Sequence, residues 1–265
     1  MTDGCSRDDG LGGQDERRRR LPYSWEEGEE AAYEEWVDEV VAHAPLPYAV
    51  IPYTTWSGKQ GELEVCWSAL EFEPCFDIEM ELRDIDLSEL SECRWLKVIY
   101  LRDFQLERID LGPLAHCERL ETLYLNGNQF EEIDLRPLAG HPRLRMLHLG
   151  GNRLREVDLS PLASCPNLAE LYLGGNQFEE IDLGPLARCS NLAGLYLGGN
   201  QLREVDLGPL ARCSNLAELS LSKNQLCEVD LGPLARCSNL AHLHLDGNRL
   251  EEVDLGPLAR CSNLV

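Results

Sequence analysis

Leucines recur along most of this chain at a spacing of 24 residues. Each recurrence opens one phrase, which from Leu192 reads L-A-G-L-Y-L-G-G-N-Q-L-R-E-V-D-L-G-P-L-A-R-C-S-N. Seven full copies occupy 96–263, and an eighth, truncated copy begins at Leu264. A degenerate first unit covers about 72–95, where Ile85-Asp86-Leu87 and Cys93 keep the register. A period of this length predicts a solenoid of stacked coils.

The first half of each copy alternates apolar and polar positions. Leu171 and Leu173 flank Tyr172, which predicts a short strand with both leucines in the core and the tyrosine facing out. One such strand cannot bury itself. Stacked coils would place the strands in a parallel sheet, ~4.8 Å apart.

The second half of each copy predicts a short helix or 3-10 turn. Val205 and Leu207 face the core, and Asp206 faces out. Pro209 fits the first turn of a helix, and Gly208 takes the N-cap position. The sequence therefore predicts an α/β fold: a right-handed, curved solenoid with a parallel sheet inside and short helices or 3-10 turns outside.

Two polar positions recur inside the predicted core. An asparagine follows the strand in six of the seven full copies, from Asn128 to Asn248. It is expected to bond the backbone of the bend, which would otherwise lack partners. A cysteine follows each short helix and is interpreted as a small buried apolar side chain. A metal or redox ladder is the alternative for the cysteines, but the sequence has no C-x-x-C pair. The cysteines are Cys93, Cys117, Cys165, Cys189, Cys213, Cys237 and Cys261, with His141 at the same position in one copy.

An aspartate precedes each short helix and forms an outward acidic ladder from Asp86 to Asp254. These carboxylates are expected to accept hydrogen bonds from the N–H groups at the start of the helix. Calcium binding is the alternative, but calcium-binding repeats carry several acidic residues per turn together with glycine.

The segment before the repeats has a different pattern. Residues 1–22 are polar and predict a disordered tail. Residues 23–71 predict an amphipathic helix at about 25–43 and a hairpin formed by Tyr48–Trp56 and Glu62–Trp67, and a strand is expected near 76–82. The helix and hairpin are expected to cap the first coil of the solenoid at 72–265. Docking of the helix on a partner is the alternative.

The net charge of −23 lies mostly in residues 21–90 and disfavours nucleic acid as a partner. The one basic run, 17–20, is interpreted as part of a solvated tail, with a localisation or nucleic-acid patch as the alternative. No apolar run is long enough for a membrane span, and the N-terminus lacks the apolar core of a secretory signal. We therefore expect a cytoplasmic protein that contacts no membrane.

The C-terminal end predicts an open solenoid. The sequence stops two residues into a new copy, which leaves the leucines of the seventh copy without a following coil. On this ground we expect the chain to be a fragment of a longer repeat protein. The oligomeric state is not predicted.

Candidate partner-binding residues lie on the outward strand positions. Four tyrosines on a solvent-facing sheet are typical of an interaction surface. The alternative is that the stacked rings only stabilise the sheet. The glycines that follow the strands are expected to leave one margin of the sheet face without large side chains, and so open to a partner. The candidates are Tyr100, Tyr124, His148, Tyr172, Tyr196, Glu170, Glu218, His242 and His244.

A weaker candidate is a metal site, because His242, His244 and Asp246 alternate on one strand and Glu218 lies beside them in the preceding copy. Two surface histidines need no metal, so this remains the less favoured interpretation. No cofactor is predicted. The phosphate-binding, zinc-protease and nucleophile-elbow motifs are absent, so no enzymatic activity is expected.

The repeat as a whole resembles the leucine-rich-repeat superfamily. The D-L-x-P-L-x-x-C phrase resembles the intracellular type of bacteria and archaea, and also the slightly longer cysteine-containing repeats of eukaryotes. Extracellular relatives carry disulfide caps, which this chain lacks. The resemblance implies recognition of a protein or peptide on the concave face by a stand-alone module or scaffold. The alternative is the sensor or autoregulatory arm of a larger signalling enzyme, such as a GTPase or a ubiquitin ligase.

Overall fold

A computed structural model of the chain describes residues 48–55, 57–66, 71–72, 82–93 and 95–264. The predicted tail at 1–22 and helix at 25–43 lie outside the described residues, as does nearly all of the strand expected at 76–82. Within the described part, no helix has the length and apolar character that crossing a bilayer requires.

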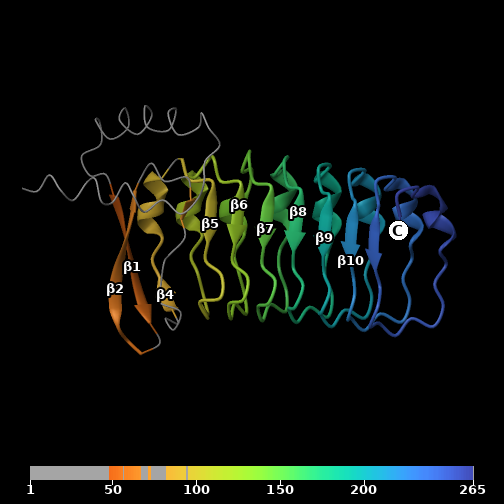
Figure 1. Cartoon of the computed structure of the whole chain (residues 1–265), viewed down its shortest axis with the longest axis horizontal. Coiled ribbons are helices and arrows are strands. Elements are labelled where there is room, and N and C mark those ends of the chain that lie inside the picture. The colour runs from red at the N-terminus through yellow and green to blue at the C-terminus, as the bar shows by residue number, and fades with distance from the viewer. Residues whose placement is uncertain (1–47, 56, 67–70, 73–81, 94, 265) are drawn as a thin grey trace, which may run out of the picture. The chain divides into compact units, whose positions relative to one another are not determined.

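The repeats form one parallel sheet of eight strands, in the order β11-β10-β9-β8-β7-β6-β5-β3. The repeat strands lie side by side in chain order (Figure 1). Their bounds are β5 Val98–Tyr100, β6 Thr122–Tyr124, β7 Met146–His148, β8 Glu170–Tyr172, β9 Gly194–Tyr196, β10 Glu218–Ser220 and β11 His242–His244. The strand of the degenerate unit is β3, Glu71–Phe72, which pairs in parallel with β5. The predicted period, strand positions and parallel pairing are confirmed.

Every outer segment is a 3-10 helix. Their bounds are η1 Ser88–Glu92, η2 Gly112–His116, η3 Arg136–Leu138, η4 Ser160–Ser164, η5 Gly184–Arg188, η6 Gly208–Arg212, η7 Gly232–Arg236 and η8 Gly256–Arg260. The N-cap of η6 is Leu207, one residue before the predicted Gly208. The Asp206 Oδ1 atom accepts a hydrogen bond from the Gly208 N–H at 2.8 Å. The side chain that caps the helix therefore belongs to the residue before the N-cap. The same bond recurs from Asp86 to Asp254, as predicted.

The core is one continuous cluster of leucines and cysteines. Cys213 is completely buried, and its Sγ lies 3.3 Å from the Leu186 carbonyl oxygen of the preceding coil. Burial raises the pKa of this thiol to about 12. Six buried cysteines have no disulfide partner: Cys117, Cys165, Cys189, Cys213, Cys237 and Cys261. Cys227 is exposed. Leu255 is 60% exposed, whereas Leu231, at the same position one coil earlier, is 2% exposed.

The asparagines that follow β6 to β11 bond the backbone of their own coil and of the preceding one. The Asn176 Nδ2 atom donates to the carbonyl oxygens of Leu149 and Leu173, at 3.0 and 2.9 Å. Its Oδ1 atom accepts from the Leu154 N–H at 3.1 Å. Because buried backbone groups need partners, this side chain closes the bend and ties two coils together. The predicted structural role is confirmed.

The predicted hairpin is present as β1, Tyr48–Thr55, and β2, Gln60–Cys66, in antiparallel pairing. β1 also pairs antiparallel with β4, Leu82–Ile85, which forms a three-stranded sheet separate from the parallel one. Ile51 of β1 is completely buried and belongs to the core cluster. The hairpin therefore covers apolar side chains of the first coil.

Candidate functional site

The last residues of the repeat strands line up across the exposed face of the parallel sheet. Strand pairing places each beside its equivalent in the next coil. We call this line the ring column. It consists of Tyr100, Tyr124, His148, Tyr172, Tyr196, Ser220 and His244. Every member is half-buried except His244, which is exposed. The predicted column is therefore assembled, with its side chains partly open to solvent.

The first five members stack as one row of rings. The Tyr100 and Tyr124 ring centroids lie 5.0 Å apart with 6° between the ring planes. Tyr124 and His148 lie 6.2 Å apart and are tilted by 39°. His148 and Tyr172 lie 4.6 Å apart, and Tyr172 and Tyr196 lie 4.1 Å apart and are parallel within 1°. Most ring faces therefore cover one another, which leaves ring edges and hydroxyls toward solvent.

Two carboxylates hold the tyrosine hydroxyls of the row. The Tyr172 hydroxyl donates to Glu170 Oε2 on the same strand. The Tyr196 hydroxyl donates to Glu218 Oε2 of the next coil at 2.9 Å. Burial, together with these carboxylates, raises the pKa of both tyrosines. The two phenols therefore stay neutral donors near pH 7, and their rings have fixed orientations.

His148 belongs to the row as a neutral ring. The Gly150 N–H donates to His148 Nδ1 at 3.2 Å, so this nitrogen serves as the acceptor. Burial lowers the pKa of His148, against a smaller opposing effect of Asp103. The ring is therefore uncharged at neutral pH, and stacking between two tyrosines does not bury a charge.

The neighbouring outward column makes room for the rings. Gly194 is buried, and a Cβ atom there would lie 2.9 Å from Cε2 of Tyr196. The absence of a side chain therefore lets the Tyr196 ring lie over β9. The column as a whole consists of Val98, Thr122, Met146, Glu170, Gly194, Glu218 and His242. At the other end of the face, the Arg102 guanidinium lies 5.4 Å from the Tyr100 ring centroid.

The glycines after the strands have a structural role that the sequence interpretation missed. A Cβ atom on Gly174 would lie 2.8 Å from the Gly198 carbonyl oxygen of the next coil. Gly175 has φ +69°, a left-handed conformation that side chains disfavour. These glycines let successive coils approach closely.

The last coil brings the weak metal candidates near one another without forming a site. His242 and His244 are both exposed, with ring centroids 6.3 Å apart. His244 Nε2 lies 3.7 Å from Glu218 Oε1, and Asp246 Oδ1 accepts from the Ser222 hydroxyl at 2.8 Å. Among the residues that the structure describes, no group of three or more histidine, cysteine or carboxylate side chains is placed to hold a metal ion.

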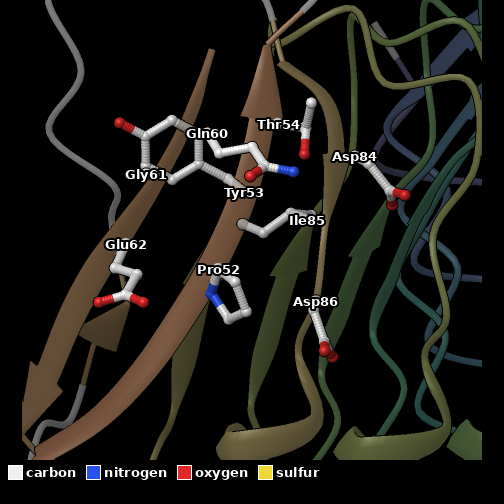
Figure 2. A pocket seen from close by; sticks show the side chains of 9 residues that line it. All are labelled: Pro52, Tyr53, Thr54, Gln60, Gly61, Glu62, Asp84, Ile85 and Asp86. Atoms are coloured by element: carbon white, nitrogen blue, oxygen red, sulfur yellow. The ribbon is translucent and has the colours of Figure 1, made fainter. Parts of the chain in front are cut away.

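Two hollows lie away from the ring column. One, of about 590 Å³, lies on the three-stranded sheet, where the Tyr53 ring packs over Gly61 (Figure 2). Of its carboxylates, Asp84 pairs with Arg108 at 3.4 Å and Asp86 bonds the Ser88 N–H. Two of the three carboxylates that line this hollow are therefore engaged within the chain.

The second hollow, of about 970 Å³, runs along the Glu-Ile/Val-Asp triplets of four successive coils. Sequence reasoning considered the aspartate row alone and missed this groove, although the repeated triplet signalled a second acidic row. Half-buried aliphatic side chains form its floor, and two rows of carboxylates line it. The groove is open, so these carboxylates do not lie in an enclosed site.

The sequence pattern of the leucine-rich-repeat family matches residues 94–154, 142–202 and 190–250. This chain belongs to the leucine-rich-repeat family. Comparison with curated proteins gives no match.

Among solved structures, the repeats are similar to an internalin of Listeria monocytogenes, at 28% identity and a TM-score of 0.53. That alignment covers 68% of this chain and 56% of the internalin. A leucine-rich-repeat protein of Leptospira interrogans shares the fold at 20% identity and a TM-score of 0.59. The alignment covers 66% of this chain and 43% of the Leptospira protein, so the chain spans about half the length of either structure.

Leucine-rich repeats are generally protein-interaction modules.

Proposed function

We propose that this chain binds a segment of another protein across the ring column on the concave face of its sheet. The observation that carries the proposal is the row of five stacked rings, each half-exposed on the face that no other element of the described chain covers. Large aromatic side chains contribute much contact area and lose little entropy on binding, which makes them frequent anchors of interfaces.

The orientation of the rings supports this role. Glu170 and Glu218 hold the hydroxyls of Tyr172 and Tyr196, and the Gly150 N–H orients His148. A partner would therefore meet side chains whose rotamers are already set, which lowers the entropic cost of binding. Stacking alone would stabilise the sheet equally well without these polar contacts.

A capture experiment tests the proposal. The wild-type chain is compared with a triple variant, Tyr124→Ser, Tyr172→Ser and Tyr196→Ser, as bait in a lysate of the organism that encodes it. Serine is chosen because Ser220 occupies the same strand position in the native chain. We expect the variant to recover at least ten-fold less of each specific partner, quantified by mass spectrometry, and the purified partner to bind with a correspondingly higher Kd.

The matched control replaces three exposed arginines of the 3-10 helices, Arg188, Arg212 and Arg236, by alanine. This variant changes the opposite side of the same coils and should recover partners as the wild type does. Equal recovery by the wild type and the tyrosine variant, with both folded by circular dichroism, would remove the ring column from consideration.

We also propose that the chain works in a reducing compartment. The supporting observation is that the six core cysteines from Cys117 to Cys261 form no disulfide and pack against leucine carbonyls of the preceding coil, as Cys189 and Cys213 do. Disulfides form in oxidising compartments, so a core that depends on unpaired thiols suits the cytosol.

A further inference from the structure

The ring column is interrupted at one position. Strand pairing places Ser220 directly between Tyr196 and His244. Rings one coil apart in this column have centroids 4.1–6.2 Å apart, so Tyr196 has a stacking partner on the side of Tyr172 only. On the side of Ser220, the paired strand position carries a small hydroxymethyl group in place of a ring.

The interruption has the dimensions of one flat group. Strands lie ~4.8 Å apart, so side chains two coils apart in a column are separated by roughly 10 Å. A flat group in van der Waals contact with a ring on each side needs about 7–8 Å between those rings. Tyr196 and His244 can therefore sandwich one planar group above Ser220 after a modest tilt of the exposed His244 ring.

A carboxylate stands at the side of this interruption. Glu218 lies on the same strand as Ser220, two residues earlier, and its side chain is 34% exposed. Its Oε2 atom accepts a hydrogen bond from the Tyr196 hydroxyl at 2.9 Å, and its Oε1 atom lies 3.7 Å from His244 Nε2. The carboxylate is thus held between the polar ends of the two rings and retains lone pairs for further donors.

The surrounding charge is negative. Glu170 lies two coils before Glu218 in the same column, and Asp246 follows His244 on the neighbouring strand. The basic residue that follows β10 is Lys223, which is exposed and lies three residues beyond Ser220. A cationic group is therefore favoured over an anionic one at this end of the face.

We propose that the interruption at Ser220 is a binding slot for an arginine side chain of the partner. A guanidinium is flat, cationic and presents two N–H groups in one plane, so it can stack between Tyr196 and His244 while it donates to Glu218. An ammonium group is not flat, and a neutral ring would not satisfy the carboxylate. The inference rests on the proposed use of the concave face and names the chemistry that the face selects.

The test uses the blocked peptide acetyl-Gly-Arg-Gly-amide, titrated into the full chain with ¹³C-labelled tyrosine and histidine and followed by NMR. We expect saturable shifts of the Tyr196 and His244 ring signals at millimolar peptide. The corresponding peptides with lysine and with citrulline, which has a similar shape and no charge, should bind at least five-fold more weakly. Equal binding of the arginine and citrulline peptides would overturn the proposal.

Variants locate the slot. Ser220→Tyr fills the interruption with the ring that most other coils carry, and Glu218→Gln removes the charge with little change of shape. Each should weaken binding of the arginine peptide at least five-fold. Arg212→Ala is the control, because this exposed arginine lies on the 3-10 helix η6, on the opposite side of the coils from the slot. It should leave the affinity unchanged. Unchanged binding by folded Ser220→Tyr and Glu218→Gln proteins would show that the slot is not used.

The outcomes separate this inference from the proposed function. One outcome is that the triple tyrosine variant loses its partners while Ser220→Tyr binds both the partners and the arginine peptide normally. In that case the ring column binds partners, and the proposed arginine slot at Ser220 is wrong. If the arginine peptide binds in the slot while the triple variant keeps every partner, the slot stands and the proposed use of the ring column fails.

Discussion

The interior of each coil and its outward strand positions follow opposite rules. In the interior, the asparagine, the leucines and the cysteine recur in nearly every coil and make the same contacts each time. Asn176 and Asn200, for example, bond equivalent carbonyl oxygens at distances of 2.9–3.1 Å. On the exposed face, the same strand position holds a tyrosine, a histidine or a serine.

This difference teaches how the repeat separates folding from recognition. A buried position must satisfy the backbone of two coils, so few side chains fit it. A face position contacts solvent and its neighbours in the column, so its identity can change without loss of the coil. The face can therefore vary along the solenoid while the framework stays constant.

The largest expected effect comes from breaking the interior. Asn176→Ala removes three hydrogen bonds and leaves buried backbone groups without partners. We expect a loss of about 3 kcal/mol in the free energy of unfolding. Urea denaturation followed by circular dichroism measures it. The control is Asn248→Ala in the last coil, where the half-buried site lets water replace the bonds, and the loss should be clearly smaller. Equal losses at both positions would contradict the stated role of burial.

An intermediate effect is expected at the cysteine position that holds a histidine. His141 replaces the cysteine, is buried, and places Nε2 3.1 Å from the Leu114 carbonyl oxygen, as the thiols do in other coils. Burial lowers the pKa of His141, against smaller opposing effects of backbone hydrogen bonds. The unfolded chain binds the proton near pH 6.5 and the folded chain only at lower pH. Stability should therefore fall as the pH drops below about 6.5.

His141→Cys should remove part of this pH dependence. We expect the loss of stability between pH 7 and pH 5 to shrink by about half, because His148 also has a lowered pKa and remains. Urea midpoints at several pH values check this, and keeping above pH 5 avoids most carboxylate titration. An unchanged pH dependence in the variant would argue against a buried neutral His141.

The smallest effect is expected on the face. Tyr124→Ser removes one ring from the row and copies the residue that Ser220 supplies in the native chain. We expect a loss of less than about 1 kcal/mol, which corresponds to the stacking of exposed rings. Thermal and urea denaturation measure it. A loss as large as that of Asn176→Ala would mean that the rings mainly support the fold, and the comparison between interior and face would fail.

Much of the framework could be predicted because each recurring residue has one physical solution. The alternation of Leu171 and Leu173 favours a strand that buries both, and Asp206 can reach the Gly208 N–H because Gly208 lies two residues later. The pairing of β1 with β4 could not be predicted, because an edge strand has several possible partners and a hairpin pattern does not say which is used.

The sequence by itself determined the coil: its period, its buried side chains, its asparagine bend and the line of outward residues. It did so because repetition samples the same local environment several times. Tertiary structure alone decided how neighbouring coils meet. The hydrogen bond from the Tyr196 hydroxyl to Glu218 and the close approach of Gly174 to Gly198 both depend on atoms 22 to 24 residues apart. Those contacts depend on the spacing and register of stacked strands, which no single repeat contains.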